Sequence, residues 1–343
     1  MAGNKKIGSK DLVKLLEKWS QEFTVFAPSR ENGEVLMREW DGKDSGFLEW
    51  YRNSTQPPKD IILPPMEKMF DFHKEKEGYR IEEPPPQQRR RLLFGIRPCD
   101  ARALTIVDMP FKEGYEDPYY LARRQGTLLV GLSCTRPYDS CFCTSVGGGP
   151  SDASGVDVLL TDTGDGYLAE AATPAGGELL DSAGLEDASP ADEAGAAETK
   201  KAALAGITRK IDSEGLKDRL LSCFEDREFW EKAAAKCLSC GVCTFFCPTC
   251  YCFDINDEMV GEQGARFKSW DSCAFSVYTQ MPMENPRLEK WRRVRQKVCH
   301  KFEFYPMNFG VFGCVGCGRC IRLCPVNWDI TRVLESLPAI AES

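Results

Sequence analysis

The chain begins with a segment in which apolar side chains recur at helical spacing. Leu12, Leu15, Leu16 and Trp19 fall on one face of residues 9–20, and this spacing predicts an amphipathic helix. Runs of apolar, β-branched and aromatic residues farther along predict strands. These runs lie at residues 23–27, 35–38, 92–96, 127–132, 156–161 and 167–172.

Residues 92–132 have the pattern of a strand, a helix and a second strand. The apolar run 92–96 is followed by Arg97-Pro98-Cys99-Asp100, which indicates a turn and a helix start, and 101–107 is the expected helix. Strands joined through such a crossover run parallel in one sheet. The N-terminal half is therefore predicted to be a mixed α/β structure.

The second half of the chain has a different pattern. Residues 182–203 are rich in Ala, Glu, Asp, Ser and Gly, which is typical of a linker with some helix. Helical spacing dominates from residue 204 onward, including 286–299 and 330–337. We expect an α+β or mixed fold with an N-terminal α/β domain (1–180), a linker and helix (181–225), and a mostly helical domain (226–343).

Composition and charge narrow the class of protein. The 343 residues are 42% hydrophobic, and no apolar run approaches the roughly 18–20 residues that a membrane span needs. The N-terminus lacks the apolar core of a signal peptide, so the expected location is the cytoplasm. A net charge of −8 disfavours nucleic-acid binding, which relies on Lys and Arg. Arg292, Arg293, Arg295 and Lys297 are interpreted as a solvated face, with a docking patch as the alternative.

Seventeen cysteines but only two histidines, His73 and His300, are present. In a cytoplasmic chain, this abundance indicates metal or redox chemistry rather than a disulfide framework. Two segments have the spacing C-x2-C-x2-C-x3-C-P of bacterial ferredoxins. These two ferredoxin runs are Cys237-Leu-Ser-Cys240-Gly-Val-Cys243-Thr-Phe-Phe-Cys247-Pro and Cys314-Val-Gly-Cys317-Gly-Arg-Cys320-Ile-Arg-Leu-Cys324-Pro.

The spacing also predicts how the ligands divide between two [4Fe-4S] clusters. Three cysteines at intervals of three wrap one loop around a cubane, and the fourth cysteine of each run ligates the other cluster. We therefore expect two crossed ligand sets: Cys237, Cys240, Cys243 and Cys324 for cluster 1, and Cys314, Cys317, Cys320 and Cys247 for cluster 2. Structural zinc is the alternative, but zinc ribbons favour two C-x2-C pairs.

Four further cysteines lie in the N-terminal half: Cys99, Cys134, Cys141 and Cys143. Cys99 and Cys134 each follow a predicted parallel strand, and the loops at such strand ends converge on one edge of the sheet. The favoured interpretation is a third [4Fe-4S] cluster. Zinc bound by the same thiolates and unligated thiols remain the alternatives. The nearby glycines 147–149 are interpreted as a plain turn, with close approach to a cofactor or to a partner's flavin as the alternative.

The remaining cysteines have no ligand spacing of their own. A further site at Cys250, Cys252, Cys273 and Cys299 is conceivable, but buried packing is the preferred interpretation. Cys223 fits helix packing. His300 is expected to be an ordinary hydrogen-bonded histidine, with a bond to a cluster sulfide as the alternative.

The chain has no Gly-x-Gly-x-x-Gly after a strand, no P-loop and no readable nucleophile–base pair. No catalytic residue is therefore predicted, and the leading hypothesis is an electron-relay subunit. An autonomous iron–sulfur oxidoreductase with its own pocket in the α/β domain is the alternative. A zinc-binding structural or sensing protein is a third hypothesis.

A family resemblance becomes specific at residues 94–143. Phe94-Gly-Ile-Arg97-Pro98-Cys99-Asp100-Ala-Arg-Ala-Leu104, Asp117-Pro-Tyr-Tyr, Arg123-Arg124, Cys134 and Cys141-Phe-Cys143 resemble the iron–sulfur beta subunits of sulfhydrogenases. They also resemble the corresponding iron–sulfur subunits of anaerobic sulfite reductases and of flavin oxidoreductase–heterodisulfide reductase complexes. Cys247-Pro-Thr-Cys-Tyr-Cys252-Phe-Asp and Asn308-Phe-Gly extend the likeness, which covers about residues 90–335, with 182–203 as an insertion.

The resemblance implies an anaerobic cytoplasmic complex. Its partners would be a gamma-type subunit that binds FAD and NAD(P)H, and the catalytic subunit of a hydrogenase, a sulfite reductase or a heterodisulfide reductase. FAD is thus expected on a partner rather than on this chain. The family does not determine the terminal partner, the direction of electron flow or the stoichiometry.

Overall fold

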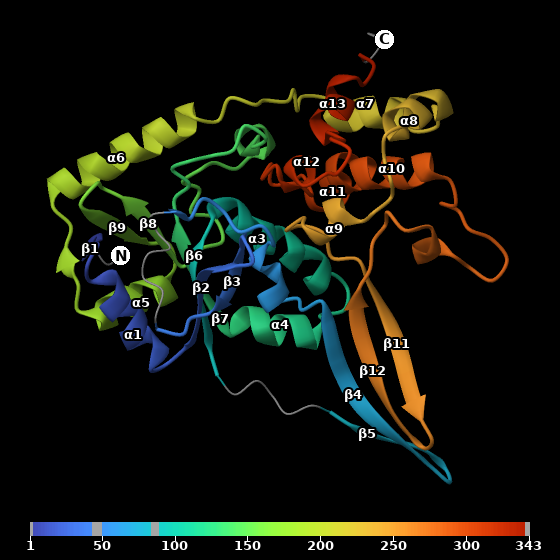
Figure 1. The fold of residues 1–343 in the computed structure, drawn as a ribbon, viewed down its shortest axis with the longest axis horizontal. Helices are drawn as coiled ribbons and strands as arrows, with labels where there is room; N and C mark the ends of the chain where they lie inside the picture. Colours follow the sequence, from blue (N-terminus) through green and yellow to red (C-terminus); the bar gives the residue numbers. More distant parts are fainter. Residues whose placement is uncertain (1–2, 43–49, 84–88, 340–343) are drawn as a thin grey trace.

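The larger of two β-sheets organises the N-terminal half (Figure 1). The computed structural model describes residues 3–42, 50–83 and 89–339. In these residues the sheet has the strand order β10-β1-β9-β8-β7-β6-β2-β3, with β2, β6, β7 and β8 parallel to one another. Its strands are β1 (Lys5–Gly8), β2 (Thr24–Glu31), β3 (Glu34–Glu39), β6 (Arg91–Ile96), β7 (Thr127–Leu132), β8 (Val158–Asp162), β9 (Gly166–Ala171) and β10 (Glu186–Asp187).

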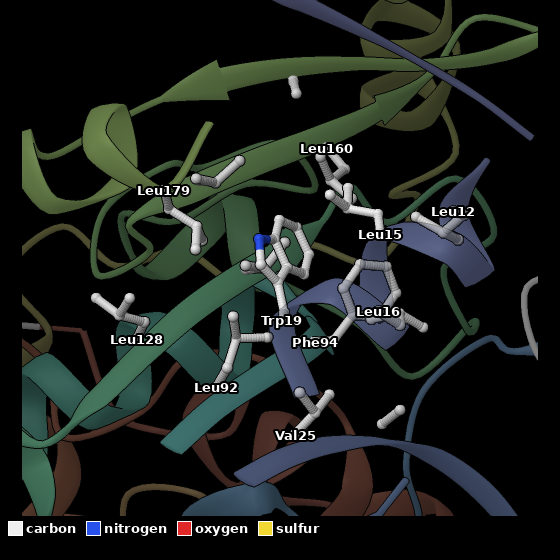
Figure 2. Packing of buried hydrophobic residues seen from close by; sticks show 14 of the residues in the cluster. Leu12, Leu15, Leu16, Trp19, Val25, Leu92, Phe94, Leu128, Leu160 and Leu179 are labelled. Atoms are coloured by element: carbon white, nitrogen blue, oxygen red, sulfur yellow. The ribbon is translucent and has the colours of Figure 1, made fainter. Parts of the chain in front are cut away.

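Helices cover both faces of this sheet because its central strands are apolar on both sides. Helices α1 (Leu12–Ser20) and α5 (Pro174–Ala183) pack on one face, and α3 (Pro98–Lys112) and α4 (Pro118–Gln125) pack on the other. Figure 2 shows Trp19 of α1 among sheet side chains such as Leu92 and Phe94. Leu93, between them in sequence, points to the opposite core, as strand alternation requires.

The segment predicted as a linker contains a regular helix, α6 (Pro190–Ala205). Ser189 and Asp192 form a reciprocal capping box at its start, which satisfies two backbone N–H groups. Lys6 Nζ of β1 lies 2.7 Å from Asp192 Oδ1, and Lys200 Nζ lies 2.5 Å from Glu170 Oε2 of β9. The helix is thus attached to the main sheet.

A second sheet joins chain segments from both halves. Its strands are β4 (Met66–Glu75), β5 (Gly78–Glu82), β11 (Phe253–Val260) and β12 (Gln263–Trp270). They are antiparallel in the order β11-β12-β4-β5, and β12 pairs directly with β4. This sheet extends away from the rest of the molecule in Figure 1. The sequence pattern did not predict the β11–β12 hairpin, which lies within the region expected to be mostly helical.

The rest of the C-terminal region is helical, as predicted. Its helices pack around a separate apolar core that contains Trp230, Val298, Phe302 and Leu334. They are α7 (Leu216–Ser222), α8 (Arg227–Ala234), α9 (Val242–Phe245), α10 (Lys290–Cys299), a π-helical turn (His300–Phe304), α11 (Tyr305–Phe309), α12 (Arg319–Arg322) and α13 (Ile330–Glu335). Short 3-10 turns lie at Pro58–Ile61, Cys143–Val146 and Ser276–Thr279.

The α+β fold class is therefore confirmed, with an N-terminal sheet domain followed by helices around the ferredoxin runs. No helix in the described ranges is both long and apolar enough to cross a bilayer.

Candidate metal centres

The two ferredoxin runs form loops with the same backbone pattern. Ser239 and Gly316 occupy equivalent positions and have φ of 55° and 63°, and the glycines that follow, Gly241 and Gly318, are also left-handed. In each loop the backbone N–H two residues after the first cysteine points at that cysteine's Sγ, at 3.4 Å for Ser239 and 3.4 Å for Gly316. Such N–H groups stabilise thiolate and sulfide charge in iron–sulfur sites.

Cys247 lies beside the second loop rather than beside its own. Its Sγ is 3.2 Å from Thr249 Oγ1 and 3.3 Å from Lys301 Nζ. Thr249 Oγ1 and Lys301 Nζ both donate to the Gly313 carbonyl, at 2.8 and 3.0 Å. These bonds hold Cys247 next to the start of the second loop at Cys314, where the crossed arrangement requires it.

Cys324 is linked to the first loop through Trp328. Its Sγ accepts a hydrogen bond from the Trp328 backbone N–H at 3.2 Å. Trp328 lines one small cavity together with Cys237 and Cys243 of the first loop. The exchange of fourth cysteines between the two loops stays a prediction.

Buried cations surround these loops. Lys59, Lys297 and Lys301 are 3%, 6% and 4% exposed. Burial alone would lower the pKa of Lys301, but the neighbouring Cys247, Cys250 and Cys314 outweigh it and raise that pKa. Burial also opposes the charge of Lys297, yet Cys243 and Cys320 raise its pKa.

Buried ammonium groups require negative partners, and here the partners are thiols. A [4Fe-4S] cluster held by four thiolates is anionic, so Lys297 at the first loop and Lys301 at the second fit such a group, whereas burial lowers the pKa of Lys59. Burial raises the pKa of Cys314 to about 12, and binding to iron offsets that cost because the metal deprotonates its thiol ligands.

Two residues of the predicted basic face have a different role. Arg293 and Lys297 are 9% and 6% exposed, so the interpretation as a solvated face is wrong for both. Arg293 Nη2 donates to Ser239 Oγ at 3.2 Å, and its Nε donates to the Ala274 carbonyl at 2.9 Å. Lys297 lies 4.6 Å from the Trp328 ring centroid. Both side chains point toward the first loop.

The four N-terminal cysteines meet at one cavity, at the edge of the sheet where β6 and β7 end. Cys99 lies in the first turn of α3, and Cys134 follows β7, where its N–H donates to the Pro150 carbonyl at 2.7 Å. Cys141 and Cys143 reach the same cavity, which Cys317 also lines. The glycine run belongs to the turn after Cys143, since the Gly148 N–H donates to the Cys143 carbonyl at 3.0 Å.

The N-terminal cysteine loop is in direct contact with the second ferredoxin loop. The Phe142 N–H donates to the Gly316 carbonyl at 2.8 Å, and Cys141 Sγ lies 3.6 Å from the Cys317 carbonyl. A Cβ at Gly316 would lie 2.6 Å from the Cys143 nitrogen, and one at Gly318 would lie 2.3 Å from Ser140 Oγ. Only glycine allows this approach.

An ion pair joins the same two regions. Arg319, inside the second run, is fully buried and binds both carboxylate oxygens of Asp100, at 2.6 and 2.8 Å. Arg319 Nε also donates to the Ser54 carbonyl at 3.0 Å. Asp100 directly follows Cys99, so this pair fixes the third candidate site against the second ferredoxin loop.

The other cysteines separate into two groups. Cys223 and Cys299 are buried in the C-terminal apolar core, as expected for packing. Cys250, Cys252 and Cys273 instead line a cavity of about 440 Å³ with His300, Lys297 and Lys301. Burial and the neighbouring Lys301 and Arg287 lower the pKa of His300 to about 4, and its Nε2 lies 3.5 Å from the Tyr251 hydroxyl.

Several of these residues were not identified from the sequence. Lys59, Lys301 and Arg319 look like ordinary surface cations in a linear pattern. For two of them the sequence offered a signal. Lys301 follows Lys297 by four residues among the apolar residues of one helical segment, and Arg319 stands inside a cysteine run.

Within the described residues, no three His, Cys, Asp or Glu side chains converge as ligands of a single metal ion do. The ligands of a cubane need not converge in that way, because each thiolate binds a different iron.

Comparison with known proteins agrees with the geometry. Residues 236–328 match the family model described as a 4Fe-4S dicluster domain. The chain is 30% identical to sulfhydrogenase 2 subunit beta of Pyrococcus furiosus over 319 residues, which cover 91% of this chain and 92% of the relative. No solved structure matches the chain. The chain therefore belongs to the iron–sulfur beta-subunit family that includes this sulfhydrogenase subunit, and is an iron–sulfur electron-transfer subunit.

Proposed function

We propose that this chain relays electrons between an FAD- and NAD(P)H-binding gamma-type partner and a catalytic partner in an anaerobic cytoplasmic complex. The catalytic partner would be a hydrogenase, a sulfite reductase or a heterodisulfide reductase. The contact between the N-terminal cysteine loop and the second ferredoxin loop is the observation that carries this proposal. A relay needs a continuous series of sites, and this contact between two candidate sites supports such a series.

The ligands we assign are the two crossed sets and the N-terminal four. Cys237, Cys240, Cys243 and Cys324 would hold cluster 1, Cys314, Cys317, Cys320 and Cys247 would hold cluster 2, and Cys99, Cys134, Cys141 and Cys143 would hold a third cluster. Such clusters supply reversible one-electron reduction. The protein's part is to neutralise their charge with buried lysines and Arg319 and to keep the three sites close together.

The two ferredoxin loops differ in exposure, which suggests where one partner docks. The second loop is covered by Phe142 and Cys143. In the first loop, Cys240 is exposed and Leu238 is 62% exposed. We assign the first loop to the surface that faces a redox partner, because electron transfer requires close approach of the two centres.

The test uses the intact complex, prepared without oxygen. Cys240→Ser and Cys317→Ser are each expected to abolish electron flow through the complex while the partner flavin still oxidises NAD(P)H. The free chain should contain about 12 irons, at four per cubane, and Cys134→Ala should lower this to about 8. Cys223→Ala, in the apolar core, is the control. Unchanged flow in either serine variant would contradict the relay.

The alternative is an autonomous oxidoreductase with its own pocket in the α/β domain. A cavity of about 470 Å³ does lie between α1 and the end of α5, lined by Lys6, Lys14 and Lys18 among others, but none of the described cysteine, histidine or aromatic side chains lines it. Turnover of a small substrate by the purified chain alone would favour this alternative.

A further inference from the structure

The base of the β11–β12 hairpin brings together Cys252 and Cys273, which belong to neither ferredoxin run. Phe253 pairs with Trp270 at the last position of the ladder, and the Asp271 N–H donates to the Cys252 carbonyl at 2.9 Å. This register places Cys252 and Cys273 on adjacent strand ends. Both side chains line the same cavity.

Both thiols open on the cavity of about 440 Å³, a volume within the range of small-molecule sites. Three cations, Arg287, Lys297 and Lys301, line the same cavity. The cavity wall therefore carries cationic side chains, of which Arg287 is the one not assigned to a ferredoxin loop, and this suits a small anionic ligand.

The spacing of the two thiols distinguishes between possible roles. Cysteines that ligate one cubane bind different irons and stand apart, whereas the ladder register sets Cys252 and Cys273 on adjacent strand ends. A dithiol–disulfide couple requires two neighbouring thiols that a substrate can reach, and here both thiols face the cavity. A hydrogen bond from Cys273 lowers the pKa of Cys252 to about 6, although burial opposes this, so Cys252 is the more nucleophilic sulfur at neutral pH.

We propose that Cys252 and Cys273 form a redox-active dithiol that reduces a small anionic disulfide bound in this cavity. The Cys252 thiolate attacks one sulfur of the disulfide, which releases one thiolate and forms a mixed disulfide. Cys273 loses its proton and attacks Cys252 Sγ, which releases the second thiolate and leaves a Cys252–Cys273 disulfide. Two electrons pass to the substrate, and two protons leave the pair, one when the Cys252 thiolate forms and one from Cys273.

The couple is restored when the Cys252–Cys273 bond takes up two electrons and two protons. This return step rests on the proposed relay function, because the electrons arrive one at a time from the iron–sulfur centres. The neighbourhood suits that transfer: Lys297 lines both this cavity and the one formed by Cys237 and Cys243. Lys301 likewise contacts both the cavity and Cys247.

The experiment uses the full chain, purified without oxygen, and oxidised glutathione as the anionic probe. Tandem mass spectrometry under denaturing conditions should find a Cys252–Cys273 cross-link after incubation, and the cross-link should disappear after dithionite reduction of the iron–sulfur centres. Cystamine, a cationic disulfide, should form the cross-link at least about tenfold more slowly. Cys273→Ser should retain the full iron content and trap a mixed disulfide with glutathione at Cys252.

Three outcomes would overturn the proposal. One is that glutathione leaves both cysteines as free thiols. A second is that Cys273→Ser loses about four irons, which would make the pair ligands of a further cluster. A third is that Cys223→Ala, the packing control, abolishes cross-linking to the same degree. A cross-link that forms in the iron-loaded protein but is not reversed by dithionite would instead refute the electron supply from the iron–sulfur centres and leave the thiol exchange intact.

Discussion

Lys301 lies where the two ferredoxin runs meet. Its Nζ is 3.3 Å from Cys247 Sγ, 3.0 Å from Thr249 Oγ1 and 3.0 Å from the Gly313 carbonyl. A buried ammonium so close to a thiolate ligand favours the more negatively charged state of the centre that this ligand serves. It therefore favours the reduced state of that centre.

Lys301→Gln should lower the reduction potential of cluster 2. A unit charge a few ångströms away contributes a few kcal/mol at an effective dielectric constant of about 20, which corresponds to a shift on the order of 100 mV. Potentiometric titration followed by paramagnetic resonance measures this shift. Lys232→Gln, on the exposed surface of α8, is the control, and equal potentials in both variants would show that Lys301 has only a structural role.

Asp60 gives a second prediction at this scale. Burial raises the pKa of its carboxyl group to about 6, although Arg38 opposes this rise. Its Oδ2 accepts a hydrogen bond from Gln56 at 2.6 Å, whereas its Oδ1 has no partner in the described structure. Because the folded state holds the proton more tightly than the unfolded state, this residue's contribution to stability falls as the pH rises from about 4 to about 6.

Asp60→Asn should therefore stabilise the protein relative to the unchanged chain at pH 8. The gain is at most about 3 kcal/mol, the equivalent of a pKa shift of about 2 units, and it should vanish below about pH 3, where both states are protonated. Thermal unfolding of both proteins at several pH values measures the difference. A difference that does not vary with pH would contradict the assigned titration.

The two ferredoxin loops show how one element serves two environments. They share their cysteine spacing and left-handed positions, but Ser239 in the first loop corresponds to Gly316 in the second. Ser239 contacts Arg293 through its hydroxyl, whereas Gly316 packs against Phe142 and Cys143. The side chain is absent where another loop covers the site.

Gly316→Ser and Ser239→Gly should therefore have unequal effects, although each exchanges the same two residue types. The serine at 316 must displace the 142–143 backbone, which costs about 1–3 kcal/mol, and should also reduce the iron bound by the N-terminal cysteines. The glycine at 239 should change stability by less than about 1 kcal/mol, because it relieves a left-handed serine. Iron content and the thermal midpoint measure both effects, and equal losses would refute the packing argument.

How well the sequence predicted each element depended on the source of its stability. β6 and β7 are apolar on both faces, so their local pattern was sufficient to predict parallel strands. β11 is exposed over most of its length, and its hairpin pairs with β4 from the opposite half of the chain. No local apolar pattern marks such strands, so the hairpin and the Cys252–Cys273 juxtaposition at its base could not be predicted.

The same distinction applies to the candidate centres. Ligand spacing within a run is local, and it predicted the two-cluster domain that the family model matches; the exchange of Cys247 and Cys324 stays a prediction. The convergence of Cys99, Cys134, Cys141 and Cys143 followed from the parallel sheet. The buried positions of Lys59, Lys301 and Arg319 depend on tertiary packing, and a linear sequence does not distinguish them from solvated cations.

At the scale of the whole molecule, the two halves are joined through buried polar contacts. Arg319 and Asp100 are both almost completely buried, and Arg319 also binds Asn53 and Ser54. The Tyr305 hydroxyl adds a bond to the Ile106 carbonyl at 2.7 Å. Loss of one charge of a buried pair leaves the other uncompensated, which costs about 3–5 kcal/mol.

Asp100→Asn should accordingly separate the unfolding of the two halves. We expect calorimetry to show two transitions in place of one, with a loss of about 3–5 kcal/mol. The iron bound by Cys99, Cys134, Cys141 and Cys143 should be lost before that of the ferredoxin loops. Asp187→Asn removes a surface ion pair with Lys5 and should leave the unfolding transition almost unchanged, because solvent screens such pairs. A single unshifted transition in Asp100→Asn would mean that apolar packing alone holds the halves together.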